Sequence, residues 1–303
     1  MADGFIAYIC KVKNNRFSLI KAGEILICRS YTDKMLTFPN AKINIGLHIT
    51  EKRTDGFHNL ESCFYPVGWC DALEILPAQE LSFHNSGIPI PGDSQNNLCL
   101  KAYYLLKKDF DIPPVWIHLH KVVPIGAGLG GGSADGAFTI TTLNKLFSLK
   151  LTTEQMQQYA RQLGSDCAFF VENQPKYCFG KGDEFDEIGI HLKGKYIILV
   201  NPNIHISTAE AYTGILPHAA EVDLKEILKQ PIAMWKDLVK NDFEKNLLLK
   251  YPVIANIKHE LYQYGASYAS MTGSGSTVFG IFDNTIDLKQ AFNKYMIWQG
   301  ELL

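Results

Sequence analysis

Residues 124–134 restrict the fold of this chain more than any other part of its sequence. They hold five glycines within seven positions, between an alternating strand pattern at 115–120 and helical spacing of apolar residues at 133–147. Glycines let successive backbone N–H groups turn toward one point, and the N-terminus of the next helix adds partial positive charge. This predicts a phosphate-binding loop, in which Ser133 can offer a hydroxyl to a phosphate or its metal. The loop consists of Pro124, Ile125, Gly126, Ala127, Gly128, Leu129, Gly130, Gly131, Gly132, Ser133 and Ala134.

Three common phosphate-binding motifs can be compared with this loop. The P-loop requires a Lys directly after its last glycine, and none is present. Gly126, Gly128 and Gly131 satisfy the spacing of the dinucleotide fingerprint, but that fingerprint also needs an acidic residue at the end of a second strand. The corresponding region, near Glu154, is instead the capped start of a helix. The H-R-D and D-F-G motifs of protein kinases are absent.

The rest of the chain predicts an α+β fold with two domains. Residues 42–49 alternate as a strand, and Thr152 with Gln155 forms a capping box for a helix that ends at Gly164. Further helices are predicted at 224–234, 238–249 and 254–264, and a second glycine loop at 271–276 leads into a strand. We expect one domain at 35–180 and the other at 181–303. Residues 1–34 are expected to be an extension outside the fold, either disordered or produced by a start assigned too early.

Composition excludes several classes of protein. The net charge of −2 disfavours nucleic-acid and polybasic membrane partners, and no apolar run approaches the roughly 20 residues of a membrane span. Seven cysteines occur without a C-x-x-C pair and without His partners at metal-site spacing, which indicates reduced thiols. We therefore expect a cytoplasmic protein that is a monomer or a weak homodimer.

Four motifs in the same order resemble the GHMP kinase superfamily, whose members phosphorylate small molecules. They are the glycine loop, Asn40-Ala41-Lys42-Ile43-Asn44, Asp55-Gly56-Phe57-His58 and Met271-Thr272-Gly273-Ser274-Gly275. The resemblance covers residues 37–303 and implies a two-domain α+β fold with the active site in the cleft between the domains. Within the superfamily, the motifs are most similar to those of members that act on a cytidine diphosphate-linked methylerythritol.

The resemblance also assigns catalytic roles. From the sequence alone, two roles for Asp166 have equal support: a proton acceptor beside an apolar stretch, or the N-cap of the next helix. The resemblance implies that Asp166 is the base and that Lys42 lies near Asp166 and the acceptor hydroxyl. Without the resemblance, Lys42 would be taken for an ordinary solvated lysine on the surface. Asn44, on the face of Lys42, would orient the substrate. Ser165 and Cys167-Ala168 depart from the family pattern at this point.

Binding roles are implied in the same way. Phe57 would stack on cytosine, His58 would hydrogen-bond its edge, and Tyr212 would close the sandwich. Asn97 and Lys121 fall where the family contacts the nucleotide, although either is equally a solvated surface residue. Thr272 and Gly273 would line the acceptor and γ-phosphate site rather than form a simple turn.

The predicted function is therefore phosphorylation of the 2-hydroxyl of the cytidine diphosphate-linked methylerythritol, with ATP and Mg²⁺. Two alternatives are another kinase of the superfamily, of mevalonate or homoserine type, and a non-catalytic nucleotide-binding module. An intact pair of Lys42 and Asp166 argues against a binding module, which would gain nothing from it.

Overall fold

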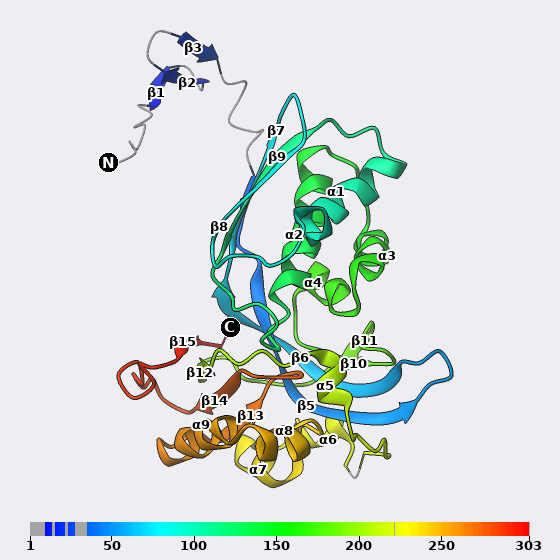
Figure 1. The fold of residues 1–303 in the computed structure, drawn as a ribbon, viewed down its shortest axis with the longest axis vertical. Coiled ribbons are helices and arrows are strands. Elements are labelled where there is room, and N and C mark those ends of the chain that lie inside the picture. Colours follow the sequence, from blue (N-terminus) through cyan, green and yellow to red (C-terminus); the bar gives the residue numbers. More distant parts are fainter. Residues whose placement is uncertain (1–9, 14–15, 22–23, 28–34, 221, 303) are drawn as a thin grey trace.

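The computed structural model describes residues 10–13, 16–21, 24–27, 35–220 and 222–302. Figure 1 shows two stacked parts, an upper one with most of the long helices and a lower one with a helix layer at its base, joined by two long strands. Helices and strands are both abundant, and the predicted α+β class is confirmed.

The upper part is a four-stranded sheet covered on one face by helices (Figure 1). Its strands, in spatial order, are β4 (Met35–Thr37), β7 (Ala72–Pro77), β9 (Val115–Lys121) and β8 (Ser82–Gly87). In this sheet only the β8–β9 pair is parallel. The two strands are joined by a crossover that contains a helix, which is the connection that parallel strands require. The helical layer comprises the 3-10 turn η2 (Ser94–Asn96), α1 (Leu98–Asp109), α2 (Gly131–Leu146), α3 (Thr153–Leu163), the 3-10 turn η3 (Ser165–Ala168) and α4 (Phe169–Glu172).

Helix α3 shows how local sequence sets these boundaries. Thr152 accepts a hydrogen bond from the Gln155 N–H, and the Gln155 side chain accepts one from the Thr152 N–H, so the predicted capping box is confirmed. The helix ends before Gly164, as predicted, but Gly164 has a φ of 166°. It is therefore in extended backbone and not in the left-handed conformation expected of a glycine at this position.

Two long antiparallel strands connect the two parts. They are β5 (Asn40–Lys52) and β6 (His58–Cys70), and β10 (Lys176–Phe179) and β11 (Glu184–Glu187) extend their sheet in the order β11-β10-β6-β5. The pairing shifts register at Gly46, which has a φ of +70°. Such a bulge bends a strand. As a result, the residues predicted to share one face are all buried but divide between two cores, with Ile43 and Ile45 in one and Leu47 and Ile49 in the other.

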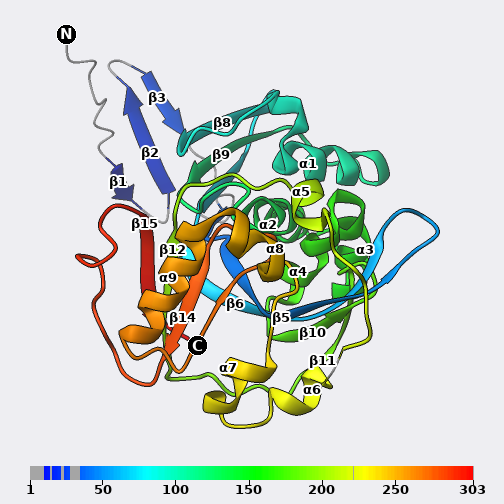
Figure 2. The same cartoon turned by 60° about the horizontal axis from the view of Figure 1, so that its bottom comes forward.

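The lower part is an antiparallel sheet with helices packed on it, and Figure 2 shows α9 lying across its strands. The sheet has the order β13 (Tyr268–Met271), β14 (Val278–Phe282), β12 (Tyr196–Asn201) and β15 (Met296–Glu301). Its helices are α5 (Thr208–Tyr212), α6 (Leu224–Ile227), the 3-10 turn η4 (Ile232–Met234), α7 (Trp235–Leu238), α8 (Glu244–Lys250) and α9 (Pro252–Gln263).

Prolines explain two of the differences from the predicted helices. The helix predicted at 224–234 is broken after α6, because Pro231 supplies no N–H and disfavours helical backbone at the residue before it. By contrast, Pro252 occupies the first turn of α9, where a missing N–H costs nothing, so this helix begins two residues earlier than predicted. Residues 239–243 do not join the helix predicted at 238–249, and α8 begins only at Glu244.

The structure describes part of the predicted N-terminal extension. Strands β1 (Cys10–Lys13), β2 (Arg16–Lys21) and β3 (Glu24–Ile27) form an antiparallel sheet within it. This sheet pairs with none of the other described strands. The remaining residues of the extension lie outside the described part of the chain.

One buried cluster joins both predicted domains. It contains Ala41 and Ile43 of β5, Leu129 of the glycine loop, and Phe279 and Ile281 of β14. The residues around the glycine loop are therefore held in place by a core to which both parts contribute. In the described part of the chain, no helix combines the length and apolar character that crossing a bilayer requires.

Candidate active site

The first glycine loop leads into the N-terminus of α2. Gly130, in left-handed backbone at a φ of +67°, precedes the helix and provides no side-chain cap. The first N–H groups of the helix therefore keep no partner within it and are free for an anion. A Cβ at Gly132 would meet nothing within 4 Å, so the first turn opens onto free space.

That space is a cavity of about 610 Å³. The glycine loop forms one wall, Asn97 and Leu98 at the start of α1 form another, and His205 and Ser207, before α5, form the third. This volume lies in the range of small-molecule and cofactor sites. The predicted phosphate loop therefore borders a cavity large enough for a nucleotide.

The second glycine loop lies directly against the first. A Cβ at Gly128 would be 2.1 Å from the backbone oxygen of Thr272, so only glycine permits this approach. Thr272 Oγ1 donates a hydrogen bond to the Gly128 carbonyl (3.0 Å) and accepts one from the Asn44 N–H (3.0 Å). Thr272 thus ties together both loops and strand β5, and it does not form a simple surface turn.

Lys42 and Asp166 meet beside the start of α2. The ammonium of Lys42 lies 3.3 Å from Asp166 Oδ2, although the residues are far apart in sequence. Lys42 is buried, and its side-chain carbons would lie 3.1–3.2 Å from a Cβ on Gly130, at the N-terminus of the helix. The structure therefore brings the predicted carboxylate and ammonium to the edge of the phosphate loop.

Asp166 does not cap a helix. It is the second residue of η3, whose cap position is Gly164, and its side chain, 30% exposed, points to Lys42 instead. The apolar wall expected beside it is present, because Phe169 and Phe170 are both buried. A carboxylate that is paired with a cation yet still reaches solvent is able to accept a proton from a bound alcohol.

Asn44 has a different environment from the one predicted. It is buried, and its Oδ1 accepts a hydrogen bond from the Lys42 ammonium (2.5 Å), while its Nδ2 donates one to Ser62 Oγ (2.9 Å). Both ends of its amide are thus occupied within the protein. Asn44 orients Lys42 in this structure, and its contact with a substrate stays a prediction.

Lys121 lines the cavity but is buried between two carboxylates. Its ammonium pairs with Asp71 and lies 2.7 Å from Asp135 Oδ2. Burial lowers the pKa of Lys121, but Asp135 and Asp71 outweigh this effect and raise it overall. Burial raises the pKa of Asp135 to about 7, against the opposing effect of Lys121. Lys121 is thus neither a solvated surface residue nor a free cation.

Asn97 also has a structural role at the cavity. Its Oδ1 accepts a hydrogen bond from the Cys99 N–H (2.8 Å) and so caps α1. The start of this helix forms a wall of the cavity, so Asn97 lies where a nucleotide contact was predicted. The cap uses the oxygen of its amide.

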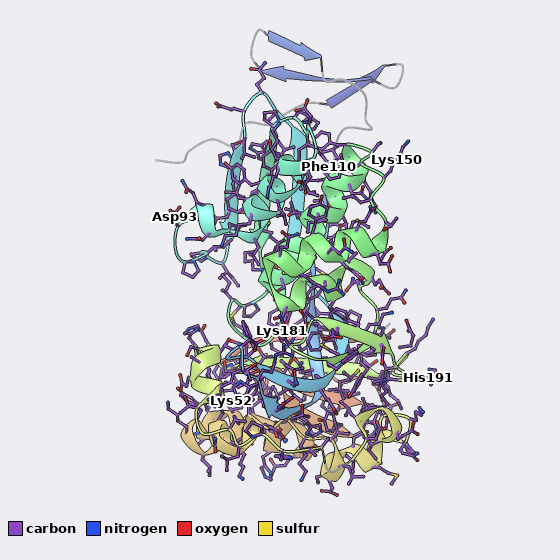
Figure 3. The ribbon with its side chains drawn as sticks, turned by 90° about the vertical axis from the view of Figure 1, so that its right-hand side faces the viewer. Lys52, Asp93, Phe110, Lys150, Lys181 and His191 are labelled. Carbon is purple, nitrogen blue, oxygen red and sulfur yellow. The ribbon has the colours of Figure 1, made fainter. Side chains whose placement is uncertain are left out.

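The residues predicted to hold a cytosine gather near the tip of the β5–β6 hairpin. His58 stacks on Tyr212, with ring centroids 4.6 Å apart and planes 21° apart. Phe57 is 60% exposed and faces Lys181, whose ammonium lies 5.4 Å from the ring centre. In this structure the His58 ring covers Tyr212, so a base between Phe57 and Tyr212 requires His58 to shift. Figure 3 shows Lys181 at the level where the upper and lower parts meet.

Comparison with known proteins identifies the family. The family model for the GHMP kinases N terminal domain matches residues 97–174, and the one for the GHMP kinases C terminal domain matches residues 223–296. A 4-diphosphocytidyl-2-C-methyl-D-erythritol kinase from Cytophaga hutchinsonii is 54% identical over 82% of this chain and 93% of its own. The chain belongs to the GHMP kinase family.

Further relatives agree with this assignment. A protein of the same name from Bacteroides fragilis is 49% identical to this GHMP kinase. The match covers 88% of this chain and 100% of the relative. A crystal structure of 4-(cytidine 5'-diphospho)-2C-methyl-D-erythritol kinase has a TM-score of 0.76 at 25% identity, covering 88% of this chain and 98% of the other. A homoserine kinase from Cytophaga hutchinsonii, at 16% identity and a TM-score of 0.67, shares the fold.

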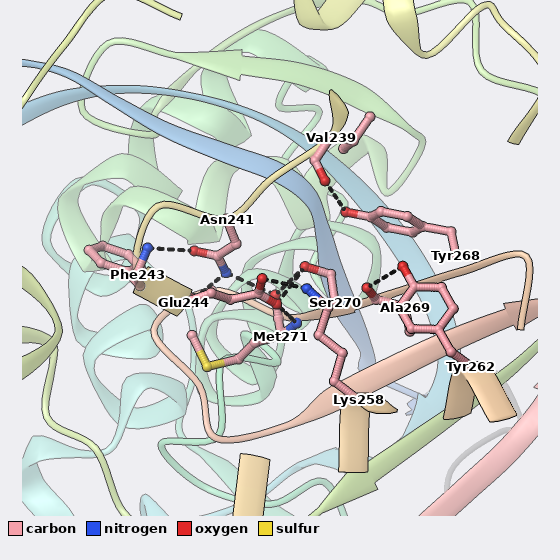
Figure 4. A network of polar contacts seen from close by, with 11 residues as sticks. Val239, Asn241, Phe243, Glu244, Lys258, Tyr262, Tyr268, Ala269, Ser270 and Met271 are labelled. Carbon is pink, nitrogen blue, oxygen red and sulfur yellow. Dashed lines mark hydrogen bonds and ion pairs between the residues drawn. The ribbon is translucent and has the colours of Figure 1, made fainter. Parts of the chain in front are cut away.

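In this GHMP kinase, a polar network surrounds β13, the strand that leads into the second glycine loop (Figure 4). Asn241 Nδ2 donates to the carbonyls of Met271 (2.8 Å) and Gly273 (2.9 Å). The buried carboxylate of Glu244 accepts hydrogen bonds from the Met271 N–H (2.8 Å) and Ser270 Oγ (3.1 Å), and it pairs with Lys258. These contacts hold β13 and the loop that follows it.

Sequence reasoning missed the residues that support the site. Asp71, Asp135, Asn241 and Glu244 are single polar residues without a motif, and they become recognisable only through burial and their partners. The one available signal was Asp135, which stands two positions after Ser133 inside the first turns of the predicted helix. A carboxylate near a phosphate site requires a nearby cation, and Lys121 supplies it.

Proposed function

We propose that this GHMP kinase transfers the γ-phosphoryl group of ATP to the 2-hydroxyl of 4-diphosphocytidyl-2-C-methyl-D-erythritol. The relatives with 49–54% identity carry the name of that kinase. The observation that supports catalysis most directly is the pair of Lys42 and Asp166, 3.3 Å apart at the N-terminus of α2. A protein that only bound nucleotide would have no use for a buried lysine directed at a partly exposed carboxylate.

The geometry suggests how the reaction proceeds. The free N–H groups at the start of α2 and the loop before it hold the phosphates of ATP in the adjoining cavity. Asp166 accepts the proton of the attacking hydroxyl, and the oxygen of that hydroxyl forms a bond to the γ-phosphorus as the bond to the β-phosphate oxygen breaks. Lys42 offsets negative charge on the transferring group. The products are ADP and the phosphorylated alcohol.

The donor groups near the loop fit Mg²⁺ that enters with ATP. No group of three or more His, Cys, Asp or Glu side chains able to hold a metal occurs in the described part of the chain. Mg²⁺ in kinases takes most of its ligands from phosphates and water. Ser133, on the first turn of α2 and on the cavity wall, would add a hydroxyl oxygen. The ion would offset charge on the phosphates.

The aromatic residues support a cytidine-bearing acceptor. Phe57, His58 and Tyr212 offer two ring faces and a hydrogen-bonding edge, and the cation of Lys181 lies beside them. Stacking on an aromatic side chain stabilises a bound base by about 1–3 kcal/mol. A mevalonate or homoserine acceptor has no ring that would use these faces.

A substrate panel tests the proposal. Purified protein with ATP and Mg²⁺ is given the cytidine-bearing alcohol, mevalonate or homoserine, and ADP release is measured with phosphorus NMR of the products. We expect release with the first acceptor alone, and a loss of about 10²–10⁴-fold in kcat for Asp166→Asn. Asp186→Asn, a surface carboxylate paired with Lys225, is the matched control and should retain activity. Turnover of mevalonate instead would reject the acceptor, and ATP binding without ADP release for any alcohol would reject the activity.

A further inference from the structure

Residues 239–243, between α7 and α8, form a short non-helical segment that bridges to β5 at Leu47. The Leu47 N–H donates to the Lys240 carbonyl (2.8 Å), and the Asp242 N–H donates to the Leu47 carbonyl (2.9 Å). These two bonds engage β5 immediately after its bulge at Gly46. The segment is therefore attached to the same strand that carries Lys42 and Asn44.

The segment also supports two parts of the acceptor site. Asn241 donates to the carbonyls of Met271 and Gly273 and so holds the second glycine loop (Figure 4). Phe243 packs edge-on against Tyr212, with ring centroids 4.9 Å apart, and Tyr212 in turn stacks on His58. A displacement of the segment would thus move the loop and the aromatic stack together.

Asp242 anchors this segment from the side. Its Oδ2 accepts a hydrogen bond from the Ile49 N–H (2.8 Å), and its Oδ1 lies 3.4 Å from Nδ1 of His48. Burial raises the pKa of Asp242, but the nearby His48 ring and the hydrogen bond from the Ile49 N–H outweigh burial and lower it overall. The carboxylate is therefore held in its charged form against β5.

His48 is unusual among the described residues. Its side chain is 6% exposed, yet neither ring nitrogen makes a hydrogen bond. Buried polar groups without hydrogen bonds are rare because they lose their contacts with water. The titratable groups around the ring are Asp242 and, beyond it, His218, whose Nε2 lies 3.8 Å from Asp242 Oδ2. Glu61 is the residue opposite on β6. The burial of His48 is explained if its ring complements the charge of Asp242.

We propose that His48 and Asp242 are a positioning pair that locks residues 239–243 onto β5 and so sets the acceptor half of the active site. Neither residue lines the nucleotide cavity. The pair acts through Asn241 on the second glycine loop and through Phe243 on Tyr212. The inference rests on the proposed function, because that function identifies the alcohol whose binding the pair would affect.

Two variants separate this role from simple stabilisation. Asp242→Asn removes the charge but keeps an oxygen for the Ile49 N–H, and His48→Phe keeps the ring volume but removes its nitrogens. We expect either variant to raise the KM for the cytidine-bearing alcohol about tenfold. A loosened segment would displace the aromatic stack and the second glycine loop, and small displacements in a site have large effects. The dissociation constant of a non-hydrolysable ATP analogue, measured by calorimetry, should change less than twofold. His218→Gln, which removes the 53% exposed imidazole on the other side of Asp242, is the matched control and should leave both values unchanged.

A double variant tests whether the two residues act together. If they form one pair, Asp242→Asn combined with His48→Phe should be no worse than the more damaging single variant. Fully additive losses, an unchanged acceptor KM, or equal losses of acceptor and nucleotide affinity would each overturn the proposal.

Hydrogen exchange provides a readout that needs no substrate. Peptides covering 46–50 and 271–275 should exchange faster in both single variants than in the wild type, whereas peptides from α1 should not change. If the wild type fails to phosphorylate the alcohol, the proposed function is wrong, and this exchange measurement still decides whether the lock exists. Unchanged exchange in 271–275 would refute the lock even in an active enzyme.

Discussion

The proposed nucleotide half and the proposed acceptor half of this site are built in different ways. The proposed nucleotide half is one continuous run, residues 124–134, in which the backbone itself offers N–H groups at the start of α2. The acceptor half is assembled from short pieces of β5, β6, α5, the 239–243 segment and the second glycine loop, and it uses side chains. A backbone site depends on a local conformation, whereas a side-chain site depends on the packing of distant segments.

This difference has a consequence for mutation. In the nucleotide half, replacing a glycine adds atoms where none fit, so damage is steric and concentrated at a few positions. In the acceptor half, a single replacement removes one contact among several, so damage should be graded and specific to one substrate. Lys42 and Asp166 lie where the halves meet, and we expect their replacement to cause neither steric damage nor a loss specific to one substrate.

Lys42→Met should reduce the rate more than a substitution within either half. The ammonium contacts both Asp166 and Asn44 and lies beside Gly130, so its loss removes a cation from the point of phosphoryl transfer. We expect kcat to fall about 10²–10³-fold in steady-state assays, with KM for either substrate changing much less. Lys236→Met, a lysine on α7, is the control. A kcat within tenfold of the wild type would mean that phosphoryl transfer does not take place beside Lys42.

Gly128→Ala should damage the nucleotide half sterically. Gly128 has a φ of +79°, and its new Cβ would lie 2.1 Å from the Thr272 carbonyl oxygen. We expect kcat/KM for ATP to fall about 100-fold, because the loops must separate, and stability in urea to fall by about 1–3 kcal/mol.

Gly132→Ala is the matched control within the same loop. Its Cβ would meet nothing within 4 Å, and alanine favours helix, so its stability should be within about 1 kcal/mol of the wild type. Equal destabilisation by the two substitutions would contradict the steric account of this half.

Tyr212→Leu should affect the acceptor half alone. It removes the ring on which His58 stacks and against which Phe243 packs. We expect the KM of the cytidine-bearing alcohol to rise about tenfold, consistent with the loss of one stacking contact, while the KM of ATP stays within twofold. Tyr264→Leu, at the end of α9, serves as a control. A matching rise in the KM of ATP would show that the halves are not independent.

Asp135→Asn should act on the pH dependence of stability. The pKa of Asp135 is raised to about 7 in the folded protein from an ordinary value of 3.8. Between these values the folded state holds the extra proton, so the free energy of unfolding is highest below about pH 4 and declines as the pH rises toward 7. The decline from this one group cannot exceed about 1.4 kcal/mol per pH unit.

Urea titrations at several pH values measure this decline. Asn cannot take up the proton, so the variant should show a flatter profile between pH 4 and 7 than the wild type. Identical slopes for the two proteins would contradict the account of the buried Asp71–Lys121–Asp135 cluster.

The contrast between the halves also explains what the sequence could predict. The glycine loop, the strand before it, helix α2 and the capping box of α3 depend on neighbouring residues, and each was predictable from local pattern. The contact between Lys42 and Asp166 was not local, and only the family resemblance suggested it before the structure placed the two side chains 3.3 Å apart.

The features that the sequence did not predict arose where distant contacts override local pattern. Asn44 lies on the polar face of its strand, as the alternation predicts, but Ser62 and Lys42 occupy its amide. For Lys121, a nucleotide contact and a solvated position were equally open, and its burial was not foreseen because Asp71 stands fifty positions earlier in the chain. The non-helical segment at 239–243 was predicted as helix, because its pairing with Leu47 cannot be read from its own residues. Strands β1–β3 were missed because their apolar stretches are short.

The contact between Gly128 and Thr272 has a wider consequence. Because the approach at Gly128 leaves no room for a Cβ, the peptide groups at this point set how closely the two loops can approach each other. This lower limit on the distance between the loops stays the same whichever rings and amides line the rest of the site. In this chain, side chains that face the alcohol can therefore be exchanged without bringing the two loops closer together.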